Sequence, residues 1–455
     1  MKGHGSASAK ERRAGRNKTL PGTATAMADD DTARRWLMRI IVAGAMIIPL
    51  VMSFSGENVF RYPKELALRF ETILIIVALV ISWAFERLHF SFDIRQTWLA
   101  LTVIICSWTI VSAIFSTNRL VSLPPTIRVI EYALVFAVTV TVMRGRPAWI
   151  AGLIVPPALV NALVYGLQEF ELWAPFDTSG APDKHIGRTA LIGNPNDVGG
   201  YLIVPALLAV VLAIVHRRGR IWWTVAATFV IIATFITQTV AAIGALVVAL
   251  IVLFALQLRS WFKATVAFLL IVSLAGALSI VYKPLAKRAA EMREALQQRD
   301  YEALSAARML PFFAAADMVR DRPIFGVGPG CFSYNFFEYK LEVQKRHRWL
   351  FGPTVTNDNF GEVHNDHLQV ASETGMPGYA LFLAALVMIA SGSWQHKKVE
   401  EEADENERSE LVRLLSLPLA VSLFVLALAQ FPLELVAPTH SYLWAAATVV
   451  SWRRS

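Results

Sequence analysis

The sequence predicts an all-helical, polytopic membrane protein with about twelve transmembrane helices and one large, partly helical loop between helices nine and ten. Of its 455 residues, 55% are hydrophobic and only 17% are charged, whereas about 25% are charged in an average soluble chain. The charged residues gather in short clusters between long apolar runs. The two cysteines cannot build a disulfide framework. These observations exclude an ordinary soluble enzyme and a disulfide-stabilised secreted domain.

The apolar runs define the predicted spans, because a helix needs about 20 largely apolar residues to cross a bilayer. Among the candidates, 221–237 and 239–257 nearly touch, and 439–452 is short. The full set comprises 36–54, 66–85, 98–115, 121–143, 148–167, 197–215, 221–237, 239–257, 264–282, 366–392, 414–431 and 439–452.

Loop charges orient the chain. Residues 1–35 are polar and basic and lack the apolar stretch of a signal peptide, so we expect a disordered cytoplasmic tail. Lys and Arg concentrate in the short loops on the side of this tail, which places both termini in the cytoplasm. We therefore expect nine spans in 36–282, an outer loop or cap over 283–365, and three spans in 366–455.

The predicted cap contains two helical segments. Residues 284–304 are rich in helix formers, and 306–321 carry apolar residues at helical spacing. The run "RPIFGVGPG" then ends the helix, and its backbone N–H groups are candidates to approach an anion. Arg308 cannot readily lose its charge and needs a carboxylate or phosphate partner if it faces inward. A plain salt bridge to Asp317, Glu302 or Glu338 is an equally good interpretation.

A second polar stretch, "VHNDHLQVASETGMPGYALFL", joins the cap to the tenth span. A histidine at the membrane boundary, here His364, can accept a proton near neutral pH. Asn365 or Asp366 is a candidate cap for the helix that follows. The alternative is that His364 is only an interfacial residue.

Further polar residues lie on the same predicted face. Asn194 and Asn196 flank a proline before the sixth span and fit a turn with a helix cap, or a polar surface to which Arg188 adds positive charge. Arg128 lies within the fourth span, where a charge indicates function unless it pairs with Glu131 at helical spacing.

Other chemistries find no support. His364 and His367 lack further ligands at metal-site spacing, and no nucleotide-binding fingerprint, nucleophile elbow or nucleic-acid-binding pattern is present. A secondary transporter or polysaccharide flippase would also fit twelve spans, but the sequence shows no repeated halves and few midplane charges. A structural or partner-binding membrane protein stays open; it predicts that His364 and Arg308 are dispensable.

Around Arg308, His364 and Asn194 the sequence resembles the O-antigen ligase and O-antigen polymerase superfamily of bacterial envelope enzymes. His364 and Asn365, followed by nine residues and then Gly375 and Gly378, match the family pattern. Arg308 followed by "PIFGVGPG", "GNPN" before a span, and the layout with one large periplasmic loop are also similar.

This resemblance implies metal-independent, inverting transfer of a glycan from undecaprenyl diphosphate to an acceptor hydroxyl at the periplasmic face of the inner membrane. His364 is then the candidate general base, and Arg308 is the candidate for neutralising the departing diphosphate. Arg188, Arg128, Asn194, Asn196 and Asn365 are the candidate substrate-binding residues. The acceptor is lipid A core for a ligase or a growing glycan for a polymerase, and no cofactor is expected.

The sequence departs from the family at one position. Family members often carry a Ser-Arg pair where the seventh span meets the eighth, and that Arg is implicated in handling the diphosphate. Here the stretch is "ITQTVAAIGAL", with no Arg near Thr239 and Val240. We expect Arg188 or Arg128 to supply the missing charge, unless the donor is held differently.

Overall fold

A computed structural model describes residues 21–53, 58–85, 96–173, 188–258, 283–298, 300–305, 308–351, 359–394 and 403–452. Within these ranges the chain is helical and contains no strand, which confirms the predicted all-helical class.

Nine helical segments in the described ranges are long and apolar enough to cross a membrane. Each corresponds to a predicted span, so the apolar runs locate these helices correctly. They are α2 (Arg61–Ala84), α3 (Thr97–Ile114), α4 (Arg119–Met143), η1 (Ala148–Ile154) with α5 (Val155–Glu169), α6 (Pro195–Val215), η2 (Arg217–Gly219) with α7 (Arg220–Ile236), α8 (Val240–Leu258), α15 (Asp366–Ala390) with η3 (Ser391–Trp394), and α16 (Ala403–Ala427).

Three predicted spans are not among these nine. The span at 264–282 lies outside the described residues. The span at 439–452 is α17 (Val436–Ser451), whose 16 residues are short for a crossing helix. The span at 36–54 overlaps α1 (Pro21–Ile47), which begins within the predicted tail because Ala and Arg favour helix there. Residues 21–35 are therefore helical in the structure, and the count of twelve stays a prediction.

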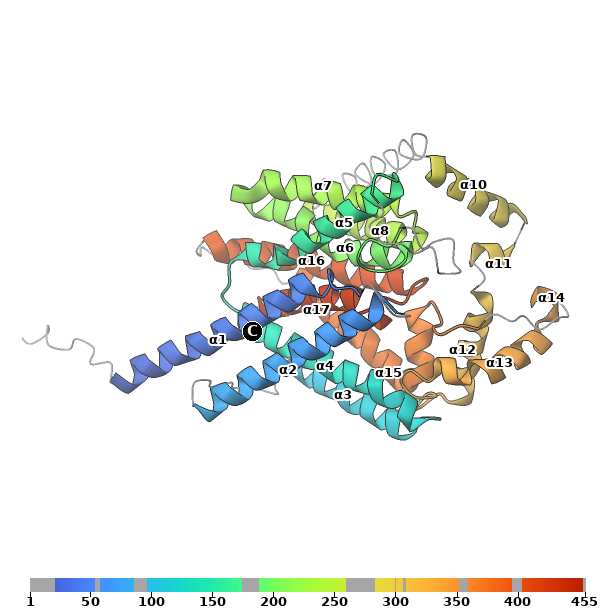
Figure 1. Cartoon of the computed structure of the whole chain (residues 1–455), viewed down its shortest axis with the longest axis horizontal. Coiled ribbons are helices and arrows are strands. Elements are labelled where there is room, and N and C mark those ends of the chain that lie inside the picture. The colour runs from blue at the N-terminus through green and yellow to red at the C-terminus, as the bar shows by residue number, and fades with distance from the viewer. Residues whose placement is uncertain are drawn as a thin grey trace, which may run out of the picture.

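Helix α6 lies at the centre of the bundle. In the most apolar stretch of α6, 83% of the residues are buried inside the protein, whereas the corresponding share for α3 is 11%. Most of α3 is therefore left for contact with lipid. Helix α6 packs against α5, α7, α8, α16 and α17. In Figure 1, α16 and α17 run between one group formed by α5–α8 and another formed by α1–α4 with α15. The two groups therefore meet along α16 and α17.

The described residues of the predicted cap contain five helices, which gather at one end of the bundle (Figure 1). The helix expected over 284–304 is divided into α10 and α11, and the "RPIFGVGPG" run ends α12 as predicted. Helix α12 packs against α13 and α15, and a separate small apolar core holds this region together. The five helices are α10 (Lys283–Gln298), α11 (Tyr301–Leu304), α12 (Met309–Asp321), α13 (Phe332–Arg346) and α14 (Arg348–Phe351).

Candidate functional site

The residues around His364 are fixed by the loop that follows α16. We call residues 428–431, which connect α16 to the short helix η4 (Pro432–Glu434), the 428–431 loop. The Asn365 side chain caps α15 by accepting a hydrogen bond from the Leu368 N–H at 3.0 Å, as predicted. Its amide nitrogen donates to the Leu428 carbonyl at 2.9 Å. Asn365 thus holds the start of α15 against the 428–431 loop.

Arg308 binds the same loop from the cap. It immediately precedes α12, and its Nη1 donates to the Ala429 carbonyl at 2.7 Å. The ring of His364 packs edge-on against Phe431, with centroids 4.7 Å apart. Arg308 and His364, which are distant in the sequence, are therefore brought together on the 428–431 loop.

The surroundings of His364 disfavour its charged form. Partial burial, and then the charges of Arg308 and Arg61, lower the pKa of His364 from 6.5 to about 4. Its φ of 59° places the backbone in the left-handed region, which is uncommon for a residue other than glycine. Among the described residues, its Nδ1 has no hydrogen-bond partner. An imidazole that is neutral at pH 7 has a nitrogen lone pair able to accept a proton.

Arg61 is a site residue that the sequence analysis did not identify. It is the first residue of α2, and its guanidinium lies 5.3 Å from the centroid of the Phe431 ring. Its Nη1 forms an ion pair with Glu362 at 2.5 Å. Arg61 belongs to no motif, and Glu362 lies just before the His364–Asn365 motif, so no sequence signal indicates that the two residues pair.

Arg128 is connected to the site by ion pairs with two glutamates. It pairs with Glu434 at 2.5 Å and with Glu65 at 3.4 Å, in place of the expected Glu131. Because Glu434 ends η4, directly after the 428–431 loop, this pair attaches the N-terminal half of α4 to the site. The role of Arg128 in substrate binding stays a prediction.

The remaining predicted residues lie at the start of α6 and in the segment that precedes it. Asn194 caps α6 by accepting from the Asp197 N–H at 3.0 Å, while Asn196 is partly exposed in the first turn. Arg188 pairs with Glu169 at 3.0 Å. These contacts explain the local structure and leave the proposed substrate contacts of the three residues as predictions.

The glycine spacing of the motif has a structural explanation. Gly375 has φ 73° and kinks α15, and a Cβ added there would lie 1.9 Å from the Ile324 carbonyl oxygen. The Met376 N–H donates to the Pro323 carbonyl at 2.8 Å, and the Val327 N–H donates to Ser372 at 2.8 Å. The "RPIFGVGPG" run therefore docks directly on the kink.

One N–H group of this run, that of Gly330, and one N–H group just after it bind a side chain of the protein. The Glu373 carboxylate accepts from the Gly330 N–H at 2.7 Å and from the Phe332 N–H at 3.3 Å. Gln369 donates to the same carboxylate at 3.1 Å. The sequence analysis missed Glu373, although an acidic residue inside a predicted span was a usable signal.

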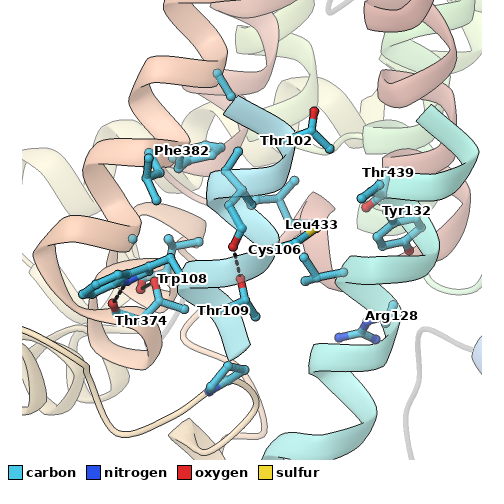
Figure 2. A pocket seen from close by; sticks show the side chains of 18 of the residues that line it. Thr102, Cys106, Trp108, Thr109, Arg128, Tyr132, Thr374, Phe382, Leu433 and Thr439 are labelled. Atoms are coloured by element: carbon cyan, nitrogen blue, oxygen red, sulfur yellow. Dashed lines mark hydrogen bonds between the residues drawn. The ribbon is translucent and has the colours of Figure 1, made fainter. Parts of the chain in front are cut away.

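A cavity of about 330 Å³ lies between α3, α4, α15 and α17. At one end it is lined by Arg128, Asp366, Glu373 and Glu434, and elsewhere its walls are mainly apolar. Figure 2 shows Arg128 and Tyr132 on α4 across the cavity from Cys106 and Trp108 on α3. Since Asp366 follows His364 and Asn365, the polar end adjoins the residues on the 428–431 loop.

Within the described ranges, no three His, Cys, Asp or Glu side chains are arranged to bind a metal ion.

These features define an all-helical, multi-pass membrane protein with a polar site at one end of its bundle. Residues 225–383 match the family model described as O-antigen ligase, which confirms the predicted resemblance to the O-antigen ligase and polymerase superfamily. That family consists of glycan-transferring enzymes, and it implies lipid-linked glycan substrates. The matched range contains Arg308 and His364. No curated protein matches the chain.

Proposed function

We propose that the protein is a membrane glycosyltransferase that moves a glycan from undecaprenyl diphosphate to an acceptor sugar hydroxyl at the periplasmic face of the bacterial inner membrane. The observation that carries the proposal is the meeting of Arg308 and His364 on the 428–431 loop, beside the polar end of the cavity. The family match, whose range includes both residues, supports the reaction class.

The reaction requires a base and a stabiliser of the leaving group. The acceptor oxygen attacks the anomeric carbon, the new glycosidic bond forms, and the bond from that carbon to the diphosphate oxygen breaks with inversion. His364 accepts the proton of the attacking hydroxyl and later releases it to water. Arg308 binds the departing diphosphate by charge-assisted hydrogen bonds. No metal ion takes part in this scheme.

The cavity suits the part of the polyprenyl chain that is next to the diphosphate of the donor. Most of its lining is apolar, and α3, which forms one wall, is largely exposed on its outer surface. A polyprenyl chain bound there gains the free energy of apolar burial, about 25 cal/mol per Å² removed from water. The diphosphate then lies near Arg308, with the glycan toward the cap. Asn365, Arg128, Arg188, Asn194 and Asn196 complete the proposed substrate-binding set.

A reconstituted transfer assay tests the proposal. Purified protein receives a lipid-linked oligosaccharide with lipid A core or with no added acceptor, and the products are separated on gels. Transfer to core indicates a ligase, whereas ladders formed without core indicate a polymerase. We expect His364→Ala and Arg308→Ala to abolish transfer. Folded protein that shows no transfer with a competent donor would refute the proposed reaction.

A further inference from the structure

The ion pair between Arg61 and Glu362 lies at the edge of the proposed diphosphate site. The two side chains are 40% and 24% exposed, so both are partly accessible to solvent. Arg61 also contacts the Phe431 ring, which in turn contacts His364. Arg61 and Arg308 are the two cations whose charges act on His364. An anion beside His364 would therefore lie within reach of both.

A diphosphate needs more than the single positive charge of Arg308. Of the other nearby cations, Lys64 is buried and donates to three backbone carbonyls, those of Val51, Phe60 and Leu191. Arg128 is paired with two glutamates. Arg61 differs from them because it is more exposed and forms an ion pair with a loop residue, Glu362.

Glu362 holds the position that an external anion would take. A carboxylate and a phosphate use the same guanidinium donors, so the two compete for Arg61. Glu362 belongs to the loop that leads into α15, where only two residues separate it from Asn365. Asp197 and Glu434 also act electrostatically on Arg61 and would hold its guanidinium near the site when Glu362 leaves.

We propose that Glu362 occupies Arg61 while the site is empty, and that the donor's diphosphate displaces it, so that Arg61 and Arg308 bind the leaving group together. This inference rests on the proposed function and adds Arg61 as a substrate-binding residue and Glu362 as an internal competitor. It also links donor binding to the base. Once the diphosphate neutralises the two cations, they no longer oppose protonation of His364, whose basicity then rises.

Opposite effects of two substitutions test the competition. Binding of undecaprenyl diphosphate and of inorganic pyrophosphate to the purified full-length protein is measured by calorimetry. Arg61→Gln should weaken both affinities about tenfold or more, because a charge-assisted hydrogen bond is lost. Glu362→Gln should strengthen both severalfold, because the competing carboxylate is gone. Undecaprenol, which has no phosphate, should bind all variants alike.

An exposed ion pair on α13 supplies the matched control. Lys345 and Glu342 are 2.9 Å apart, and Lys345→Gln and Glu342→Gln should leave both affinities unchanged. If the Arg61–Glu362 pair only supports the fold, Arg61→Gln and Glu362→Gln will weaken binding together and lower the melting temperature together. That result, or an unchanged affinity in Glu362→Gln, overturns the inference.

The transfer assay separates this inference from the proposed reaction. Opposite changes in affinity without any glycan transfer would support the competition at Arg61 and refute the reaction. Transfer by the wild type without opposite changes would support the reaction and refute the competition.

Discussion

His364 and Phe431 form an edge-on aromatic pair with ring centroids 4.7 Å apart and an interplanar angle of 75°. Such pairs fix ring orientation and contribute about 0.5–1.5 kcal/mol beyond the burial of their area. Phe431 is itself buried, with 4% exposure. The 428–431 loop thus orients the imidazole with a rigid apolar side chain, while its backbone carbonyls hold Arg308 and Asn365.

Replacing Phe431 with leucine should reduce turnover more than stability. Leucine keeps much of the apolar volume, and we expect a loss of less than about 2 kcal/mol in the free energy of unfolding. The imidazole loses its aromatic neighbour, so kcat should fall about tenfold or more. Thermal unfolding and initial transfer rates measure the two effects. Phe229→Leu on the exposed face of α7 is the control. Equal rates in the two variants would show that Phe431 does not orient His364.

The pH dependence of transfer should show how the charges of the cations beside His364 affect its pKa. Because the pKa of His364 is about 4, the base is deprotonated over the neutral range, and kcat/KM should fall only as the pH approaches about 4. Burial and Arg61 still lower the pKa of His364 in Arg308→Gln, but one charge that opposes protonation is gone, so the pKa should rise part of the way toward 6.5 and the fall should begin at a higher pH. Arg308→Lys keeps the charge and serves as the control.

Glutamine keeps a hydrogen-bond donor at position 308, so Arg308→Gln should retain a residual transfer rate that Arg308→Ala does not. Only the shape of the pH profile is compared. An acid limb at the same pH in wild type, Arg308→Gln and Arg308→Lys would mean that His364 is not the base or that Arg308 does not act on it.

Sequence patterns located most helices but not the assembly of the site. Apolar runs depend on local composition, so nine described segments coincide with predicted spans. Asn194 and Asn365 were identifiable as caps because capping uses residues within three positions of each other. The 428–431 loop carries no motif, and its role depends on backbone carbonyls and one phenylalanine. Such contacts between distant segments have no sequence signal.

Charge partners were the least predictable feature. Helical spacing suggested that Arg128 pairs with Glu131, but the tertiary fold brings Glu434 and Glu65 to it instead. For the same reason Arg61, which lies outside every motif, becomes a neighbour of His364. A long side chain selects its partner from all the helices that pack around it.

Gly375→Ala should prevent correct docking of the cap on α15. The added Cβ would lie 1.9 Å from the Ile324 carbonyl oxygen, and φ is 73°, so steric overlap and backbone strain act together. We expect poor yield of folded protein and, in any folded fraction, a melting temperature lowered by several degrees. Gly166→Ala in α5 is the matched control because a Cβ there meets nothing within 4 Å. It should be neutral or slightly stabilising. Similar behaviour of the two variants would contradict the docked geometry.

The cavity should be detectable through Cys106, one of the two cysteines in the chain. Cys106 is partly exposed and lines the cavity, while Cys331 is fully buried, so N-ethylmaleimide should label Cys106 selectively. Undecaprenyl diphosphate at ten times its Kd should slow this labelling about tenfold, because about one tenth of the cavities stay open.

Inorganic pyrophosphate should bind only at the polar end and leave the labelling rate of Cys106 unchanged. Cys106→Ser should abolish labelling of the folded protein, and denaturation should then expose Cys331 as an internal standard. Labelling is quantified by intact-protein mass spectrometry. If the lipid diphosphate fails to protect Cys106 while calorimetry shows that it binds, the polyprenyl chain lies outside this cavity, because a chain threaded between α3 and α15 would cover the thiol.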